Sequence, residues 1–188
     1  MTCVIPMTRR GVAVLVALCG APVTGVEAQF LDMHVSAGAA IGLARTGVFF
    51  PSGVQAQGGV RATLPRLPVA FQVDGGWLRL AGDSETLGID GVHVTQWSAA
   101  FSTVWKVPVS PRASVRPYVL VGGGLHRRPS IDPLGLAFTA VGLHGGGGAD
   151  FRAAGLRGFV EFRYVDVLLE RRDVEYLTLS VGVRAAVR

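Results

Sequence analysis

The chain is nearly free of cysteine, and the two that it has, Cys3 and Cys19, lie within its first 20 residues. If the chain is cleaved after residue 28, what remains holds no thiol, which excludes disulfides, cysteine ligands and a thiolate nucleophile. Beyond residue 28 no apolar run is long enough to cross a bilayer as a helix. Lysine is almost absent as well, because Lys106 is the only one among 18 basic residues. These absences leave a fold that is held by packing and backbone hydrogen bonds.

The first 28 residues predict a cleavable export signal. Arg9 and Arg10 supply a positive region, residues 11–20 form a short apolar run, and modest side chains at 26–28 predict cleavage before Gln29. A lipoprotein modified at Cys19 is the alternative, although the residue before this cysteine is a leucine and not the small residue that such sites favour.

Basic residues outnumber acidic ones by 18 to 13. Removing the two arginines and one glutamate of the predicted signal leaves 16 basic and 12 acidic side chains, a net charge of +4. Guanidinium groups bind phosphate in a fork, so this excess suits the anionic surface of lipopolysaccharide. Because the charges are scattered and the chain carries an export signal, we do not predict nucleic-acid binding.

Residues 29–188 contain strand-length runs in which apolar and polar residues alternate. Side chains in a strand repeat every two residues, so each run has one apolar face and one polar face. In the last run Leu177, Leu179 and Val181 oppose Thr178 and Ser180. The 26 glycines suit sheets in which strands or bulky side chains approach closely. The eight predicted strands are 30–43, 54–64, 69–80, 92–107, 113–126, 137–151, 156–167 and 174–184.

The predicted connections alternate between short and long. Short turns on the periplasmic rim and longer outer loops are typical of outer-membrane barrels, and an even number of strands places both chain ends on the periplasmic rim. The expected tight turns are 65–66, 110–112 and 152–155, and the longer connections are 45–53, 81–91, 127–135 and 168–173.

Four segments, 116–124, 145–151, 159–164 and 177–184, carry a resemblance to a known class of protein. They resemble the small eight-stranded outer-membrane β-barrels, the class of the OmpA transmembrane domain and OmpX. The resemblance implies an all-β fold: a closed antiparallel up-and-down transmembrane barrel over residues 29–188 behind a signal peptide at 1–28. It also implies a bacterial outer-membrane protein without enzymatic activity or cofactor. Its partners would be outer-membrane lipid, lipopolysaccharide and the barrel assembly machinery. One departure is that the chain ends in Val187-Arg188, where such proteins usually end in an aromatic residue.

Charged residues in the middle of the runs fall on the polar face. In an eight-stranded barrel this face lines an interior just wide enough for side chains to fill, so we expect a packed polar interior of ion pairs and no wide pore. A narrow channel for ions or small solutes through the same residues is the alternative. Trp97, Trp105, Phe162 and Tyr164 are expected to anchor the barrel at the membrane interfaces. The expected charge network of the lumen comprises Arg61, Asp74, Arg116, Glu161, Arg163 and Arg184.

The longer loops carry basic pairs that are candidates for contacts with lipopolysaccharide phosphates. These are Arg127, Arg128, Arg171 and Arg172.

Enzymatic and metal-dependent functions find little support in the sequence. His34, His126 and His144 lie on three strands without the close spacing of a metal site, so no metal is predicted. The glycine runs 122–124 and 145–148 lack the lysine and hydroxyl residue of a phosphate loop. The lipid A deacylase barrels look to a His-x-Ser pair late in the chain, and no histidine follows His144. A soluble, lipocalin-like binder with its apolar faces turned inward is a further alternative.

Overall fold

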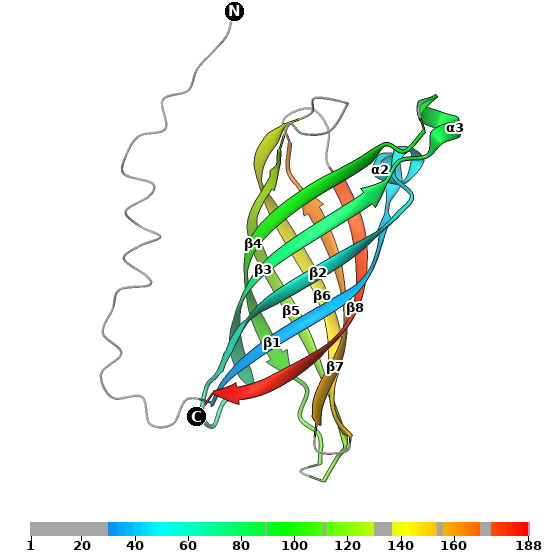
Figure 1. Cartoon of the computed structure of the whole chain (residues 1–188). Coiled ribbons are helices and arrows are strands. Elements are labelled where there is room, and N and C mark those ends of the chain that lie inside the picture. The colour runs from blue at the N-terminus through cyan, green and yellow to red at the C-terminus, as the bar shows by residue number, and fades with distance from the viewer. Residues whose placement is uncertain are drawn as a thin grey trace, which may run out of the picture.

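Eight antiparallel strands close into one barrel in which each strand pairs with its sequence neighbours and β1 pairs with β8. Figure 1 shows these strands strongly inclined to the barrel axis. The computed structural model describes residues 30–88, 90–110, 112–129, 137–153, 156–169 and 174–187. The strands are β1 (Phe30–Gly42), β2 (Ser52–Thr63), β3 (Val69–Ala81), β4 (His93–Lys106), β5 (Val115–Arg128), β6 (Phe138–Ala153), β7 (Leu156–Val167) and β8 (Val174–Val187). The predicted closed eight-stranded barrel is confirmed.

The predicted strand boundaries lie within three residues of the observed ones. β4 ends at Lys106 and β5 begins at Val115, so this connection spans eight residues and is longer than expected. Within it the backbone N–H of Ala113 donates to the carbonyl of Ser110 at 2.9 Å, which closes a turn at the predicted place. Pro108 contributes to this early end of β4, because proline has no N–H to donate to a ladder.

The two ends of the barrel differ in their connections. The start of β1, the end of β8 and the connections between β2 and β3 and between β4 and β5 lie at one end, which we call the turn rim. The connections between β1 and β2 and between β3 and β4 lie at the other end, the loop rim.

Two short helices, α2 (Ala44–Phe49) and α3 (Ser84–Leu87), lie at the loop rim (Figure 1). The backbone N–H of Asp83 donates to the carbonyl of Phe49 at 2.9 Å and ties the two helical loops together. The Asp83 carboxylate caps α3 by accepting from the backbone N–H of Thr86 at 3.1 Å, and hydrogen bonds from Thr86 lower the pKa of Asp83. Within the described ranges, no helix is long and apolar enough to cross a membrane.

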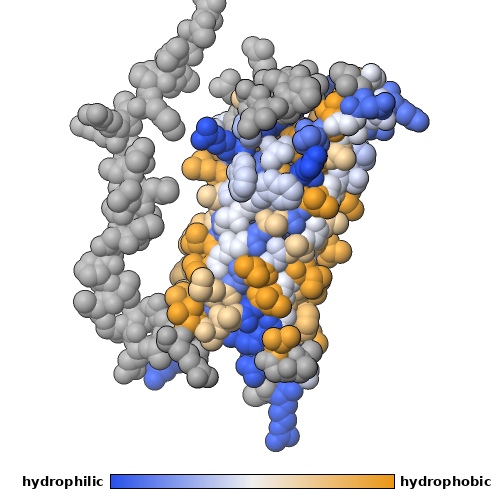
Figure 2. Space-filling model, in the orientation of Figure 1, coloured by the Kyte–Doolittle hydropathy of each residue, from blue (hydrophilic) through white to orange (hydrophobic). Residues whose placement is uncertain are grey.

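The outer wall of the barrel is apolar at mid-height on every strand. Val35 is 60% exposed, Val121 65% and Val181 60%, although all three lie in the middle of their strands. Figure 2 shows hydrophobic residues along the flanks of the barrel, residues of intermediate hydropathy between them, and strongly hydrophilic residues mostly toward both ends. The faces predicted to be apolar therefore point outward.

Glycines on the inner wall give room to large inward side chains. A Cβ placed on Gly182 would lie 2.5 Å from a ring carbon of Phe159, and one on Gly148 would lie 2.7 Å from the hydroxyl of Tyr118. Phe159 and Tyr118 are 1% and 2% exposed, so both fill the interior. The glycines act as predicted: they admit close strands and aromatic neighbours.

Candidate functional site

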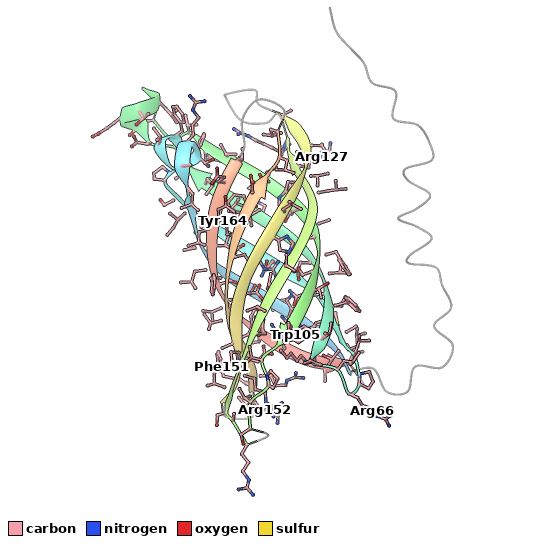
Figure 3. The ribbon with its side chains drawn as sticks, turned by 180° about the vertical axis from the view of Figure 1, so that it is seen from behind. Arg66, Trp105, Arg127, Phe151, Arg152 and Tyr164 are labelled. Carbon is pink, nitrogen blue, oxygen red and sulfur yellow. The ribbon has the colours of Figure 1, made fainter. Side chains whose placement is uncertain are left out.

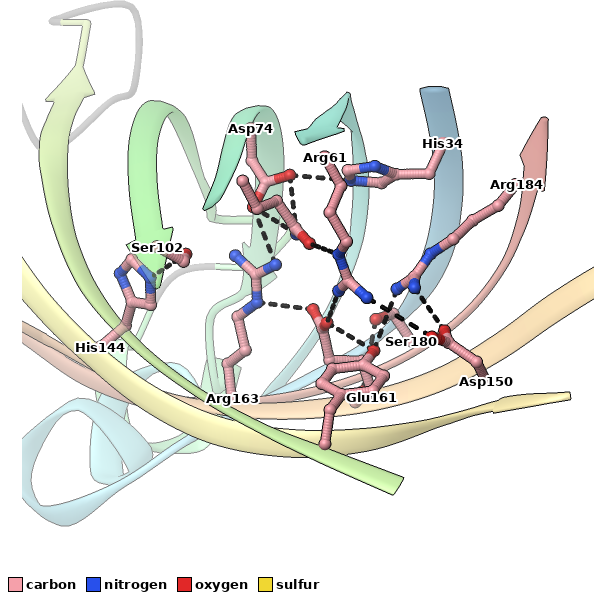
Figure 4. A network of polar contacts seen from close by, with 12 residues as sticks. His34, Arg61, Asp74, Ser102, His144, Asp150, Glu161, Arg163, Ser180 and Arg184 are labelled. Carbon is pink, nitrogen blue, oxygen red and sulfur yellow. Dashed lines mark hydrogen bonds and ion pairs between the residues drawn. The ribbon is translucent and has the colours of Figure 1, made fainter. Parts of the chain in front are cut away.

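The interior of the barrel is the candidate site, because the charged residues predicted from the sequence meet there. Its centre holds one connected set of polar side chains, which we call the central network (Figure 4). Its members are His34, Arg61, Gln72, Asp74, Tyr118, Asp150, Glu161, Arg163 and Arg184.

Asp74 on β3 is one hub of the central network. Its two carboxylate oxygens accept from the Gln72 amide at 3.0 and 2.9 Å and from Nη2 of Arg163 at 2.8 Å. Nε2 of His34 lies 2.8 Å from Oδ1 of the same carboxylate. A buried carboxylate with this many partners is fully satisfied, which offsets the cost of removing it from water.

Glu161 on β7 is the second hub. Its carboxylate accepts from Nε of Arg163 at 2.6 Å and from the hydroxyl of Tyr118 at 2.7 Å. Nη2 of Arg61 lies 3.7 Å from Oε2 of the same carboxylate. Arg163 therefore joins the two hubs, because its guanidinium group bonds to Asp74 and to Glu161.

Arg61 and Arg184 extend the central network toward the turn rim. Nε of Arg61 donates to Oε1 of Gln72 at 2.6 Å, and both arginines form ion pairs with Asp150. The guanidinium carbon of Arg184 lies 4.2 Å from the ring centre of Phe159, and that of Arg61 lies 4.6 Å from the ring centre of Tyr118. Cation–π contacts of this kind add attraction where water is excluded.

The central network balances three guanidinium groups against three carboxylates. Five of the six residues expected in the charge network belong to it: Arg61, Asp74, Glu161, Arg163 and Arg184. Arg116 is exposed at the turn rim, opposite Asp150 in the strand register. It lies on the inner face as predicted, but too close to the end of β5 to be enclosed.

Sequence reasoning did not nominate Gln72, Tyr118 or Asp150 for the charge network. All three lie on the polar faces that alternation predicts, so their direction was visible in the sequence. Which inward residues meet in the central network depends on the register between strands, and the alternation of apolar and polar residues does not give that register.

The three lumen histidines bind three different partners. His34 contacts Asp74, Nδ1 of His126 lies 2.9 Å from the Gln96 amide, and Nε2 of His144 lies 2.8 Å from the Ser102 hydroxyl. No group of three metal-ligating side chains occurs among the residues described. These histidines act as buried hydrogen-bonding groups.

The lumen is not polar throughout, which corrects the expectation of a wholly polar interior. Near the loop rim the interior holds a buried cluster that we call the apolar layer, and Phe50 packs against it. Leu80 is 3% exposed and Val167 0%. The members of the apolar layer are Ala40, Leu78, Leu80, Val165, Val167 and Tyr176.

The polarity of the wall inverts at the height of the apolar layer. On β3 the apolar side chains of Leu78 and Leu80 face inward, and Arg79 between them faces outward and is exposed. β7 repeats the pattern, with Val165 and Val167 inside and Asp166 between them on the outer face. On these two strands the ends nearest the loop rim therefore carry apolar residues inside and a charged residue outside. The signal was present in the sequence, because an arginine stands between two leucines at 78–80.

The basic residues expected to contact lipopolysaccharide lie in different surroundings. Arg127 is exposed on the outer face of β5 near the loop rim, as Figure 3 shows. Arg128 points inward and is 7% exposed, and its guanidinium carbon lies 5.8 Å from the ring centre of Phe50. The expected position of Arg128 in a loop is therefore wrong. β5 continues two residues beyond its predicted end, and alternation then turns Arg128 inward. Arg171 and Arg172 lie outside the described residues.

No protein-family model and no curated protein matches the sequence. Solved structures do match. Neisserial surface protein A aligns with a TM-score of 0.64 at 18% identity, over 86% of this chain and all of the other. This chain has the fold of the small eight-stranded outer-membrane β-barrels. The outer membrane protein AlkL, solved in lipid bilayers, aligns with a TM-score of 0.52 at 15% identity, over 89% of this chain and 94% of the other. At these identities the likeness establishes the fold, and it confirms the resemblance predicted from the sequence.

Proposed function

We propose that this protein is a non-enzymatic barrel of the bacterial outer membrane, with a structural or interaction role and a lumen filled by side chains. One observation carries the proposal: mid-strand side chains are charged inside and apolar outside, the reverse of a soluble barrel. Arg61 and Glu161 are each 1% exposed, whereas Val121 is 65% exposed. In lipid a closed barrel satisfies all backbone hydrogen bonds between its strands, and its apolar exterior is stable in contact with the acyl chains. In water the same exterior would be one continuous apolar patch, which argues against the lipocalin-like alternative.

Aromatic side chains on the outer face support a membrane band with two boundaries. Trp97 lies beside Trp77 in the strand register, just below the level at which the wall inverts its polarity. Tyr164 faces outward near the loop rim, and Trp105 and Phe151 lie near the turn rim (Figure 3). Aromatic girdles at both interfaces are typical of transmembrane barrels.

The contents of the lumen favour a filled barrel over a narrow channel. The central network ties side chains of seven strands together, and the apolar layer lies between it and the loop rim. An ion on this path would have to separate ion pairs such as Arg163–Asp74 and then pass apolar side chains. We expect no single-channel conductance in planar bilayers; discrete current steps would favour the channel.

A hydrolytic role for the Ser102–His144 pair is disfavoured by access. The two side chains are hydrogen-bonded at 2.8 Å, as in a nucleophile and its base. However, Ser102 is 0% and His144 5% exposed, so an acyl substrate cannot reach them without opening the barrel.

The loop rim carries the proposed contacts with lipopolysaccharide. Arg127 is paired in register with Trp97 and so lies at the boundary of the apolar band, where lipid phosphates gather. Arg79 is exposed on the outer face two strands away. Both guanidinium groups are placed to bind phosphate from the side of the barrel. Contacts by Arg171 and Arg172, the export signal at 1–28 and recognition by the barrel assembly machinery stay predictions.

Gel mobility and tryptophan quenching test this proposal together. The protein refolded in detergent should migrate differently before and after boiling, as closed membrane barrels do. In lipid vesicles, a variant that keeps Trp97 alone, with Trp77 and Trp105 changed to Phe, should be quenched strongly by lipids brominated on their acyl chains.

An inward tryptophan provides the control. Phe159→Trp in a background without other tryptophans places the indole in the lumen, where the same lipids should quench it little. A single gel band under both conditions, or equal quenching at both sites, would overturn the membrane assignment.

A further inference from the structure

Six cationic side chains line a pocket of about 580 Å³ at the turn rim. We call this pocket the basic mouth. Its other lining residues include one carboxylate, Asp150. The cations come from the ends of five strands and from the 107–114 connection: Lys106, Arg112, Arg116, Arg152, Arg157 and Arg184.

The basic mouth opens into the lumen and not toward lipid. Arg116 and Arg184 lie on the inner faces of their strands. Arg116 is two residues before buried Tyr118. Arg184 is two residues after Gly182, which lies beside Phe159. Arg184 is 6% exposed, and its Nε has no hydrogen-bond partner among the described residues. A ligand entering from the aqueous end would therefore meet a buried guanidinium group at the floor and exposed ones at the entrance.

The acidic groups near the basic mouth leave most of its charge unbalanced. Asp150 pairs with Arg184 and also with Arg61 of the central network. Asp32 holds Arg157 through two hydrogen bonds of 2.5 and 3.0 Å. Even with both carboxylates counted, cations exceed anions by four among the described residues around this cavity. Like charges held this close repel one another, so a bound anion would relieve repulsion that the protein alone sustains.

We propose that the basic mouth binds a small polyanion that carries two or more phosphate groups. Guanidinium groups bind phosphate oxygens in forked pairs, and several of them around one cavity match several phosphates better than a single charge. The volume lies within the usual range of about 300–1,000 Å³ for small-molecule sites, which is more than one inorganic phosphate requires. The phosphates can come from a soluble molecule or from the headgroup of an anionic lipid. The inward direction of the lining side chains favours the soluble source.

Calorimetric titration of the full barrel with pyrophosphate in an uncharged detergent tests the proposal. We expect saturable binding of one pyrophosphate per chain that weakens as salt is raised. Arg116→Gln and Arg152→Gln change exposed residues, and each should weaken binding about tenfold, the effect of one charge-assisted hydrogen bond. The melting temperature should rise with pyrophosphate in the original protein and much less in the two variants.

Arg66→Gln is the matched control. Arg66 is exposed at the same rim, as Figure 3 shows, but does not line the pocket, so this variant should bind within twofold of the original. Absence of saturable binding, or equal weakening by Arg66→Gln and Arg116→Gln, would overturn the proposal. Competition by cardiolipin in nanodiscs would assign the phosphates to a lipid headgroup, and its absence to a soluble ligand. The periplasmic location of the mouth rests on the proposed function, whereas binding in detergent does not.

Discussion

Changing Glu161 to glutamine should lower the free energy of unfolding by about 3 kcal/mol, because it leaves the buried network with one positive charge in excess. The glutamine keeps the shape of the side chain and can still accept one hydrogen bond. It cannot balance Arg163, which lies 2.6 Å away, or Arg61 at 3.7 Å. The central network would then hold three guanidinium groups and two carboxylates.

Changing Arg163 to glutamine as well should recover part of that loss. Each single variant leaves an excess charge in the lumen, and the double variant again has equal numbers of cations and anions. We expect the double variant to be at least about 1 kcal/mol more stable than the sum of the two single effects predicts, which is within the range for residues in one network.

Urea unfolding of the barrel in lipid vesicles, followed by the fluorescence of outward tryptophans such as Trp97 and Trp105, measures these differences. Glu85→Gln on α3 serves as the control, because Glu85 is exposed and its loss should change stability by less than about 0.5 kcal/mol. Additive single effects, or a cost below about 1 kcal/mol for Glu161→Gln, would refute the reasoning. They would mean that water screens these charges, as in a hydrated channel.

Two further pairs of substitutions test the wall of the barrel. Val121→Arg places a charge on the middle of the outer face and should lower the free energy of unfolding in urea by about 2–4 kcal/mol. Val115→Arg lies on the same face of β5 near the turn rim and should lower it by at most about 1 kcal/mol. Equal losses would argue against a membrane band. Gly59→Ala should lower the urea midpoint, because its Cβ would lie 2.1 Å from the backbone oxygen of Val73 and 2.7 Å from Oδ1 of Asp74. Gly58→Ala should be tolerated, since its nearest atom is 3.4 Å away, and equal effects of the two alanines would contradict the inward role of Gly59.

The architecture was predictable from the sequence because one rule, the two-residue period of a strand, acts on every run. It places Asp74, Glu161 and Arg163 on one side and Val73, Phe162 and Tyr164 on the other, and any closed sheet must then have a charged and an apolar wall. The eight runs and their even number follow from the same pattern. Their pairing partners do not, because alternation says which way a side chain points and not which residue lies opposite.

The apolar layer was missed because the expectation applied one polarity to the whole length of each strand. A strand that extends beyond the lipid band exchanges its faces, since water replaces lipid outside and the interior then gains from apolar packing. Arg79 between Leu78 and Leu80 carries this signal, and so does Asp166 between Val165 and Val167. The point of inversion marks where the outer environment changes, and it therefore locates the upper edge of the proposed membrane band.

The central network depends on glycines in a way that joins the sequence to the register. His34 on β1 and Asp74 on β3 both lie opposite Gly59 on β2, and their hydrogen bond passes over it. The same arrangement recurs where Ser102 reaches His144 over Gly122, and where Tyr118 reaches Glu161 over Gly148. Strands two apart are separated by about 10 Å, so these three pairs of side chains meet across a position at which the middle strand has no side chain of its own. The inward glycines at 59, 122 and 148 thus make room for three polar contacts between alternate strands.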